Sequence, residues 1–264
     1  MEMELLKDLF EQDEQMKEAL NAEDTMKTLD LEQWERDAYQ SGMFADRVDI
    51  IEQNCQILAK RLLKKKLKTQ FETWKLFVYL FREAIRNAPE HGKANVVQFQ
   101  ALLEEEADQS YLNLKVTDGG IGIYNSLCMN RVHKSYLENN REALLWALKP
   151  GISGSFSPGH NGRENDPNAN SGYGLFMISE VVKKLGGSMV LASGTATLYL
   201  DRDTCTVKDI PYQGTALLLQ FPTDGIDDFQ ALIDEVRISG EAAAKEIKHA
   251  FQEASAPSKG LLQL

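Results

Sequence analysis

Residues 111–118 read Tyr-Leu-Asn-Leu-Lys-Val-Thr-Asp, and the four residues that follow read Gly-Gly-Ile-Gly. Apolar and polar side chains alternate with a period of roughly two over residues 111–117, which predicts a β-strand. An Asp followed by two glycines predicts a turn where that strand ends. The segments on either side can be interpreted by working outward from this strand and its turn.

The segment before this strand predicts a helix and a second strand. Residues 71–87 are apolar and rich in aromatic side chains, which is typical of a helix packed into a core. Pro89 lacks a backbone N–H and disfavours helix at Ala88, so we expect the helix to end or kink there. Residues 95–103 predict a strand, and the acidic residues 104–108 predict a turn before the next strand.

The segment after the glycines is long and varied. Residues 123–171 predict a connecting region with one helix at 135–148, and such a long irregular stretch in a compact domain is usually functional or disordered. A helix and four strands at hairpin-like spacing follow, at 175–185, 188–192, 195–200, 204–207 and 215–221. This order predicts a two-layer α+β domain, a mostly antiparallel sheet covered by helices on one face.

Glu83 and Asn87 lie four residues apart in the first predicted helix, so their side chains project from the same face. An amide oxygen beside a carboxylate suits a magnesium ion, which prefers oxygen ligands and usually keeps several waters and substrate phosphates. The carboxylate can then act as a general base. Taken alone, this spacing is explained more often by an ordinary polar pair that faces solvent.

Asp118 and the glycines after it also have two interpretations. A carboxylate at a strand end can accept a hydrogen bond from an exocyclic amine such as that of adenine, while Gly120 and Gly122 let the backbone pass close to a flat ligand. An ordinary turn explains the same residues. Thr215, in the last strand, can reach the same ligand or a water that bridges to Asp118, or it is simply a β-branched strand residue.

Gly172, Gly174 and Leu175 open the helix after the long connection. Exposed N–H groups at a helix start, with glycines before them, form a natural cradle for phosphate. A flexible loop before an N-capped helix is the plainer alternative. Each of these signals is weak alone, whereas together and in this order they are strong.

Four segments resemble sequence motifs of one known family: 83–91, 118–122, 170–175 and 214–222. In order, they resemble the N box, the two glycine boxes and the closing Gly-Thr strand of the GHKL superfamily of ATPases, which includes gyrase, heat-shock chaperones, histidine kinases and mismatch-repair proteins. The family has the Bergerat fold, an antiparallel or mixed sheet with helices on one face. The resemblance covers residues 70–222 and implies an ATP-binding domain there. Residues 1–69 and 223–264 lie outside it, and their own sequence predicts a helical extension and a helical tail.

The resemblance implies that the ligands are ATP and Mg²⁺. Asn87 would ligate a magnesium ion that bridges the phosphates. Asp118 would bind the adenine amino group, with Thr215 in support. Glu83 would be the catalytic residue, the base for water or for a serine hydroxyl.

The glycines have matching roles in the family. Gly120 and Gly122 would let the chain pass beside the adenine, and the segment of Gly172, Gly174 and Leu175 would bind the phosphates. Residues 123–171 would form an ATP lid, which orders on nucleotide binding. Lys149 and Arg163 are candidate phosphate contacts within this lid, or else ordinary exposed charges.

Three functions follow from the resemblance. Glu83 favours a slow ATPase or nucleotide-driven switch that acts on a protein partner, since histidine kinases of the family usually carry Asn there. The first alternative is an anti-sigma-type serine protein kinase or a histidine-kinase-like catalytic domain, although no histidine precedes His91 to serve as a phosphoacceptor. The second alternative is a non-enzymatic ATP-binding interaction protein.

The composition limits where in the cell the protein is expected and what it is expected to bind. The net charge of −11 opposes sequence-independent binding to nucleic acid. Neither a membrane-spanning run nor an apolar signal-peptide core is evident, so we expect a cytoplasmic protein. The three cysteines and four histidines lack the spacing of metal sites. We expect the helical extensions to mediate self-association or to bind a protein partner.

Overall fold

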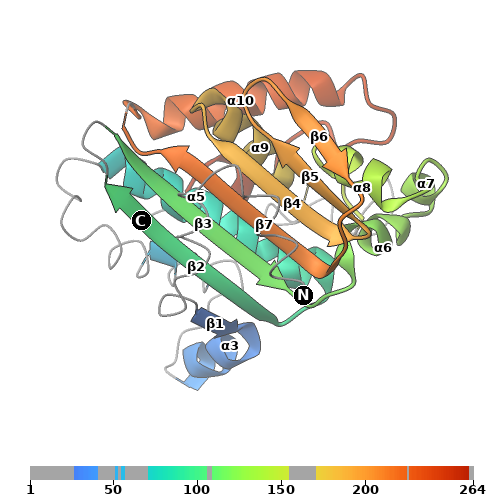
Figure 1. Ribbon diagram of the computed structural model, residues 1–264, viewed down its shortest axis with the longest axis horizontal. Coiled ribbons are helices and arrows are strands. Elements are labelled where there is room, and N and C mark those ends of the chain that lie inside the picture. The colour runs from blue at the N-terminus through green and yellow to red at the C-terminus, as the bar shows by residue number, and fades with distance from the viewer. Residues whose placement is uncertain are drawn as a thin grey trace.

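The structure, a computed structural model, describes residues 27–40, 51–52, 55–56, 71–105, 109–154, 171–224 and 226–261. These residues form an α+β fold in which one antiparallel sheet packs against helices (Figure 1). The predicted fold class is confirmed at this level.

Within the described residues the sheet has seven strands in the order β1-β2-β3-β7-β4-β5-β6, and each neighbouring pair is antiparallel. The strands are β1 Lys27–Asp30, β2 Val96–Glu105, β3 Ser110–Asp118, β4 Ser188–Gly194, β5 Ala196–Leu200, β6 Cys205–Lys208 and β7 Tyr212–Pro222. The six strands expected from the sequence are all present. The first and last of them in the chain, β2 and β7, both pair with β3 in the middle of the sheet.

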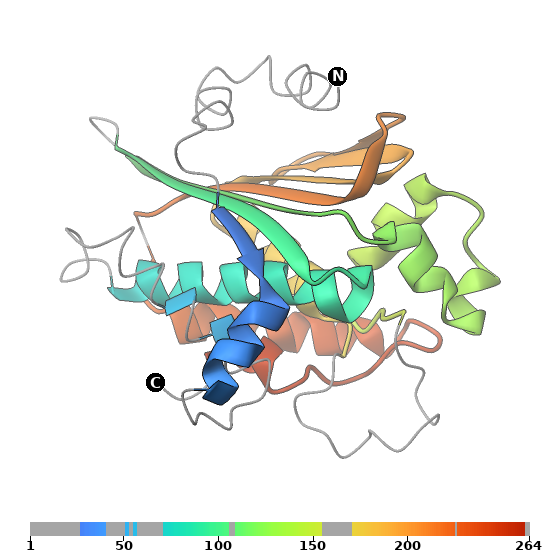
Figure 2. The ribbon, with the colours of Figure 1, turned by 90° about the horizontal axis from the view of Figure 1, so that it is seen from below.

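Helices α5 (Phe71–Asn87), α9 (Gly174–Lys184) and α10 (Phe229–Ala244) lie on one face of the sheet (Figure 2). Alternate strand residues face them: Leu112 and Leu114 of β3 belong to the same buried cluster as Phe77 and Phe81 of α5. Each such side chain contributes about 1.5–3 kcal/mol on burial. This cluster ties the sheet and the helices into one body.

Helix α5 has the predicted bounds and ends where Pro89 was expected to end it. The chain then forms a five-residue π-helical segment, η2 (Ala88–Gly92), with Pro89 in its first turn. Proline has no N–H to continue the α-helical ladder, so the backbone widens here instead of continuing straight. The wider turn brings Gly92 next to the end of β3.

The prediction of helix throughout residues 1–69 is wrong at Lys27–Asp30, which form β1. These residues pair with β2 at the edge of the sheet, and such a long-range contact overrides weak local propensity. The Asp30 side chain then accepts a hydrogen bond from Gln33 N at 3.0 Å and caps α3 (Leu31–Gln40). The helical prediction for residues 1–26, 41–50, 53–54 and 57–69 lies outside the described residues.

The long connection holds more helix than predicted: α6 (Gly122–Cys128), α7 (Arg131–Lys134) and α8 (Asn140–Ala147). The single predicted helix at 135–148 begins later, at Asn140. The reason is local, because the Asn139 side chain accepts a hydrogen bond from Glu142 N at 3.0 Å and caps the helix. Residues 155–170, including Arg163, lie outside the described residues.

The prediction of a helical tail at 223–264 is correct over α10 and wrong over residues 245–256, which form turns and irregular chain that fold back along the helical layer. Gly240 of α10 packs so closely on α9 that a Cβ there would lie 2.3 Å from the Phe176 ring. Further on, Phe251 N donates to Gly151 O at 2.9 Å, and Tyr173 OH donates to Phe251 O at 3.1 Å. The 3₁₀ turn η3 (Pro257–Lys259) ends against α5. The tail therefore contacts both flanks of residues 155–170.

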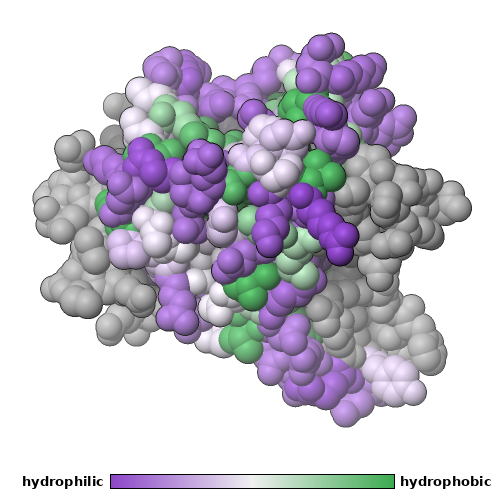
Figure 3. Space-filling model, turned by 90° about the vertical axis from the view of Figure 1, so that its right-hand side faces the viewer, coloured by the Kyte–Doolittle hydropathy of each residue, from purple (hydrophilic) through white to green (hydrophobic). Residues whose placement is uncertain are grey.

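The side formed by α6, α7 and α8 has a mixed surface (Figure 3). Met129, Tyr136 and Leu145 expose large apolar side chains, while hydrophilic residues lie between the hydrophobic ones. Among the described residues, no helix is both long enough and apolar enough to cross a membrane.

Candidate functional site

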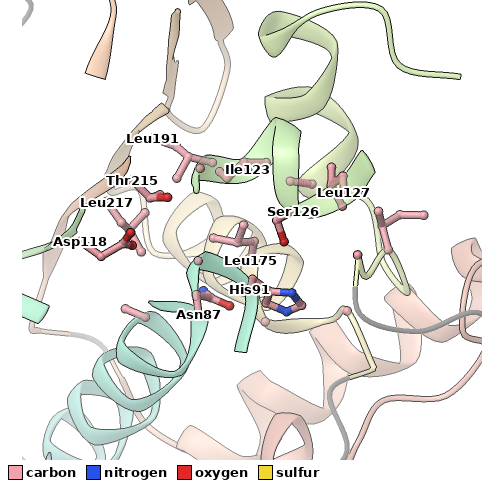
Figure 4. A pocket seen from close by; sticks show the side chains of 18 of the residues that line it. Asn87, His91, Asp118, Ile123, Ser126, Leu127, Leu175, Leu191, Thr215 and Leu217 are labelled. Atoms are coloured by element: carbon pink, nitrogen blue, oxygen red, sulfur yellow. The ribbon is translucent and has the colours of Figure 1, made fainter. Parts of the chain in front are cut away.

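A pocket opens between the end of α5, the end of β3, the first half of β7, helix α6 and the start of α9 (Figure 4). It encloses about 730 Å³ of space, which includes its open mouth. Seven of the nine predicted site residues line it: Asn87, Asp118, Gly122, Gly172, Gly174, Leu175 and Thr215. Segments that are far apart in the sequence thus meet at one cavity.

Asp118 supplies the acidic group of the pocket. Its Oδ1 accepts a hydrogen bond from Gly120 N at 2.8 Å, and the Thr215 backbone N–H also donates to its carboxylate. Burial raises the pKa of Asp118, while these two hydrogen bonds lower it and only partly offset the effect. Asp118 and Thr215 face each other in the register of β3 and β7 and lie side by side in Figure 4.

Glycine is required where β7 passes the end of β3. Gly214 has φ +86°, and a Cβ there would lie 2.0 Å from Asp118 O. Gly122 has φ +77°, and a Cβ there would lie 2.8 Å from Ser193 Oγ. Larger residues at these positions would push the strand ends apart and move the Asp118 carboxylate.

Ser193 stabilises these two strand ends, and no sequence motif indicated it. Its hydroxyl accepts from Ile123 N at 2.9 Å and donates to Gly214 O at 2.7 Å. A serine near the end of β4 therefore links the start of α6 to β7. Its role depends on neighbours about 20 and 70 residues away, which no local pattern reveals.

Gly120 does not line the pocket. A Cβ there would lie 2.1 Å from Gly92 O, and the next residue, Ile121, donates its N–H to Gly92 O at 2.8 Å. Its small size thus allows backbone to approach backbone, and it brings η2 beside Asp118. Gly92 and His91, both in the pocket lining, are carried by the same turn.

Apolar side chains form the walls of the pocket. Ile123 and Leu127 come from α6, Leu175 from α9, and Leu191 and Leu217 from the sheet (Figure 4). With Asp118 at one end, these walls suit a flat, largely apolar ring that carries a hydrogen-bond donor.

The start of α9 also lines the pocket, with Gly174 and Leu175. Its N-cap residue, Tyr173, makes no side-chain capping bond, so the first N–H groups of α9 lack the usual partner from the cap. A Cβ at Gly174 would lie 3.1 Å from Glu83 Oε2 and 3.7 Å from Asn87 Oδ1. The helix start therefore combines backbone donors with side-chain oxygens.

Asn87 points into this region, while Glu83 lies one turn behind it and is not part of the lining (Figure 4). The Asn87 Nδ2 atom is buried and has no hydrogen-bond partner among the described residues. A buried amide without a partner is uncommon and is a sign of a ligand or water that would complete it. Glu83 is buried and ion-paired with Arg82 and Arg86.

Gly172 holds the two flanks of residues 155–170 together. It has φ +73°, and a Cβ there would lie 2.3 Å from Ile152 O. Lys149, a predicted phosphate contact, does not line the pocket; its Nζ lies 4.1 Å from the centre of the Trp146 ring. Of the described residues in the lining, none is a Lys or Arg.

The sequence was compared with protein-family models and with curated proteins. No model of a protein family matches the sequence, and no curated protein matches it.

Proposed function

We propose that this pocket binds Mg-ATP and that the chain is a GHKL-type ATP-binding protein, a slow ATPase or nucleotide-driven switch that acts on a protein partner. One observation carries the proposal. A half-buried carboxylate, Asp118, and an uncapped helix start at Gly174 both line one largely apolar pocket. Adenine has a donor amine on a flat ring, and phosphates bind at helix starts, so one nucleotide satisfies both groups.

Each part of the nucleotide has a counterpart among the described residues. The adenine amine donates to Asp118, its ring lies between the leucine and isoleucine walls, and the phosphates accept from the first N–H groups of α9. Since no Lys or Arg lines the described part of the pocket, the negative charge of the phosphates needs another partner.

Magnesium is the natural partner, and Asn87 fits it. The amide group of Asn87 lies in the pocket, and its oxygen is a ligand type that Mg²⁺ accepts. Its Nδ2, which has no partner among the described residues, can donate to water or to a phosphate oxygen. In the described ranges no three His, Cys, Asp or Glu side chains gather in one place, so phosphate oxygens and water would complete the coordination. When bound, the ion would neutralise charge on the phosphates.

Glu83 is the residue we assign to proton transfer. Its Oε2 faces the start of α9, where the terminal phosphate would lie. In hydrolysis the oxygen of a water bonds to the γ-phosphorus, the bond to the β–γ bridging oxygen breaks, and Glu83 accepts the proton of the water. The products are ADP and inorganic phosphate.

The first test is a comparison of binding and turnover in two variants. Asp118→Ala should weaken Mg-ATP binding by about 10–100-fold, since a hydrogen bond to a charged group is worth about 1.5–3 kcal/mol. Glu83→Gln should bind Mg-ATP as tightly as the wild type and lose turnover. Calorimetric titration and a phosphate-release assay measure the two quantities.

Asp203→Asn, at an exposed turn far along the chain, is the matched control and should change neither quantity. Wild-type affinity in Asp118→Ala would remove Asp118 as the adenine contact. Undiminished turnover in Glu83→Gln would remove Glu83 as the base.

The alternative functions predict other products. A serine kinase would use the same Glu83 oxygen, because a carboxylate that accepts a proton from water can accept one from a serine hydroxyl. Labelled γ-phosphate would then appear on a co-purifying protein rather than free in solution. A non-enzymatic interaction protein would bind Mg-ATP stoichiometrically and release neither product.

A further inference from the structure

A buried cluster of charges lies beside the pocket, on the far side of Glu83. Arg82 is fully buried, and its guanidinium contacts the Glu52 and Glu83 carboxylates and the backbone carbonyls of Pro257 and Gly260. A cationic side chain with no exposed surface is held by several partners at once. The cluster thus joins α5, the segment around Glu52 and the end of the tail.

The two oxygens of Glu83 have different surroundings. Oε1 accepts from Arg82 Nε at 3.2 Å and from Arg82 Nη2 at 3.0 Å, and Arg86 Nη1 lies 3.5 Å from the same oxygen. Oε2 faces the start of α9, 3.1 Å from where a Gly174 Cβ would lie. Because a carboxylate is planar, fixing Oε1 also fixes the direction of Oε2.

Arg82 is in turn fixed by distant parts of the chain. Gly260 O accepts from Arg82 Nη2 at 3.0 Å, and Tyr79 OH donates to Ser258 O at 3.0 Å one turn away on α5. The Tyr79 ring also lies 5.2 Å from the Arg82 guanidinium carbon. The orientation of Glu83 therefore depends on the docked η3 segment.

We propose that Arg82 is a positioning residue for Glu83, and that the segment Pro257–Gly260 is part of the same device. Arg82 holds Oε1 so that Oε2 is presented to the terminal phosphate region beside Asn87 and Gly174. The η3 segment holds Arg82 in the orientation that this requires. This inference rests on the proposed ATPase function. It adds an explanation of how the Glu83 carboxylate is oriented toward the terminal phosphate.

Arg82→Lys is the discriminating variant. Lysine keeps the positive charge, but its single ammonium group cannot bridge Glu83, Glu52 and two carbonyls as the guanidinium fork does. We expect Mg-ATP affinity and KM to stay within about threefold of the wild type, while kcat falls by about tenfold or more, because a misplaced group weakens only the chemical step.

Arg237→Lys is the matched control. Arg237 in α10 also bonds two carboxylates, those of Asp234 and Glu241, but it is not part of the pocket lining. Its kcat should equal that of the wild type. Tyr79→Phe provides a second variant that keeps the ring beside Arg82 and removes only the bond to Ser258 O; we expect it to lower kcat by about threefold at unchanged KM.

A measurement without nucleotide tests the contact itself. The Arg82 Nε–H resonance in a nitrogen-15 NMR spectrum, assigned by its absence in Arg82→Lys, should shift in Glu83→Gln and stay in place in Arg237→Lys. An unshifted resonance in Glu83→Gln would show that the pair is not formed in solution and would overturn the proposal.

The kinetic outcomes separate this inference from the proposed function. Wild-type kcat in both Arg82→Lys and Tyr79→Phe overturns the positioning role while ATP hydrolysis stands. An equal loss of binding and turnover in folded Arg82→Lys also overturns it, because the residue would then be structural. If Arg82→Lys does not fold, Tyr79→Phe decides by its kcat. Failure of the wild type to bind Mg-ATP overturns the proposed function and this inference with it.

Discussion

Asp118 is a half-buried acid, with two backbone N–H groups as its hydrogen-bond donors. Burial raises its pKa above the ordinary 3.8, so in the folded chain the carboxyl group stays protonated to a higher pH than a free Asp does. The raised pKa makes the stability of the fold depend on pH. Its contribution to stability is full below pH 3.8 and is lost as the pH rises through the raised pKa, where a charge must be buried.

Binding of the nucleotide should show the opposite pH dependence. Only the ionised carboxylate is a pure acceptor for an amine, so the affinity for Mg-ATP should fall as the pH falls through the raised pKa, starting above pH 3.8. Titrations at several pH values measure this. Asp118→Asn should lack that part of the pH profile and retain only the part that comes from ATP and Mg²⁺ themselves. Identical profiles would contradict the role given to Asp118.

The helices and strands that could be predicted from the sequence are those that local patterns determine. Helix α5 and six strands follow from periods and turn residues that lie within a few positions of each other. β1 was missed because it is short and polar and gains its stability from an edge of the sheet some seventy residues away. Asn87, Asp118 and Gly174 were found through the order of their motifs, whereas Ser193 and Arg82 act through partners that only the folded chain brings close.

Helix α8 gives a stability prediction at this scale. Asn139 caps its first turn, and the Glu142 carboxylate accepts from Glu138 N at 2.7 Å in return. Asn139→Ala should lower the free energy of unfolding by about 1 kcal/mol, because a backbone N–H loses its partner. Urea unfolding measures the change. Asn139→Asp retains an acceptor and should unfold like the wild type; an equal loss in both variants would contradict the cap.

At the scale of the whole molecule, the tail joins the body at the flanks of residues 155–170. Gly151 has φ +76°, and a Cβ there would lie 2.2 Å from Phe251 O. Gly151→Ala should therefore push the tail away and destabilise the protein by about 1–3 kcal/mol, the usual range for a strained backbone. We also expect weaker binding of Mg-ATP, because Gly172 and the start of α9 lie beside the same contact.

Gly119→Ala is the control for this change. Apart from its own chain neighbours, no heavy atom lies within 4 Å of a Cβ at Gly119, although the residue lies directly beside Asp118. Thermal unfolding and titration of the two variants should separate clearly. If Gly119→Ala lost as much stability as Gly151→Ala, the effect would come from stiffening a glycine and not from the contact with the tail.

The contact between Phe251, Gly151 and Tyr173 has one more consequence. Residues 151–154 and 171–173, the two flanks of residues 155–170, are thereby fastened to each other in the folded protein. The entropy lost in bringing these two flanks together is therefore lost during folding, before any ligand arrives.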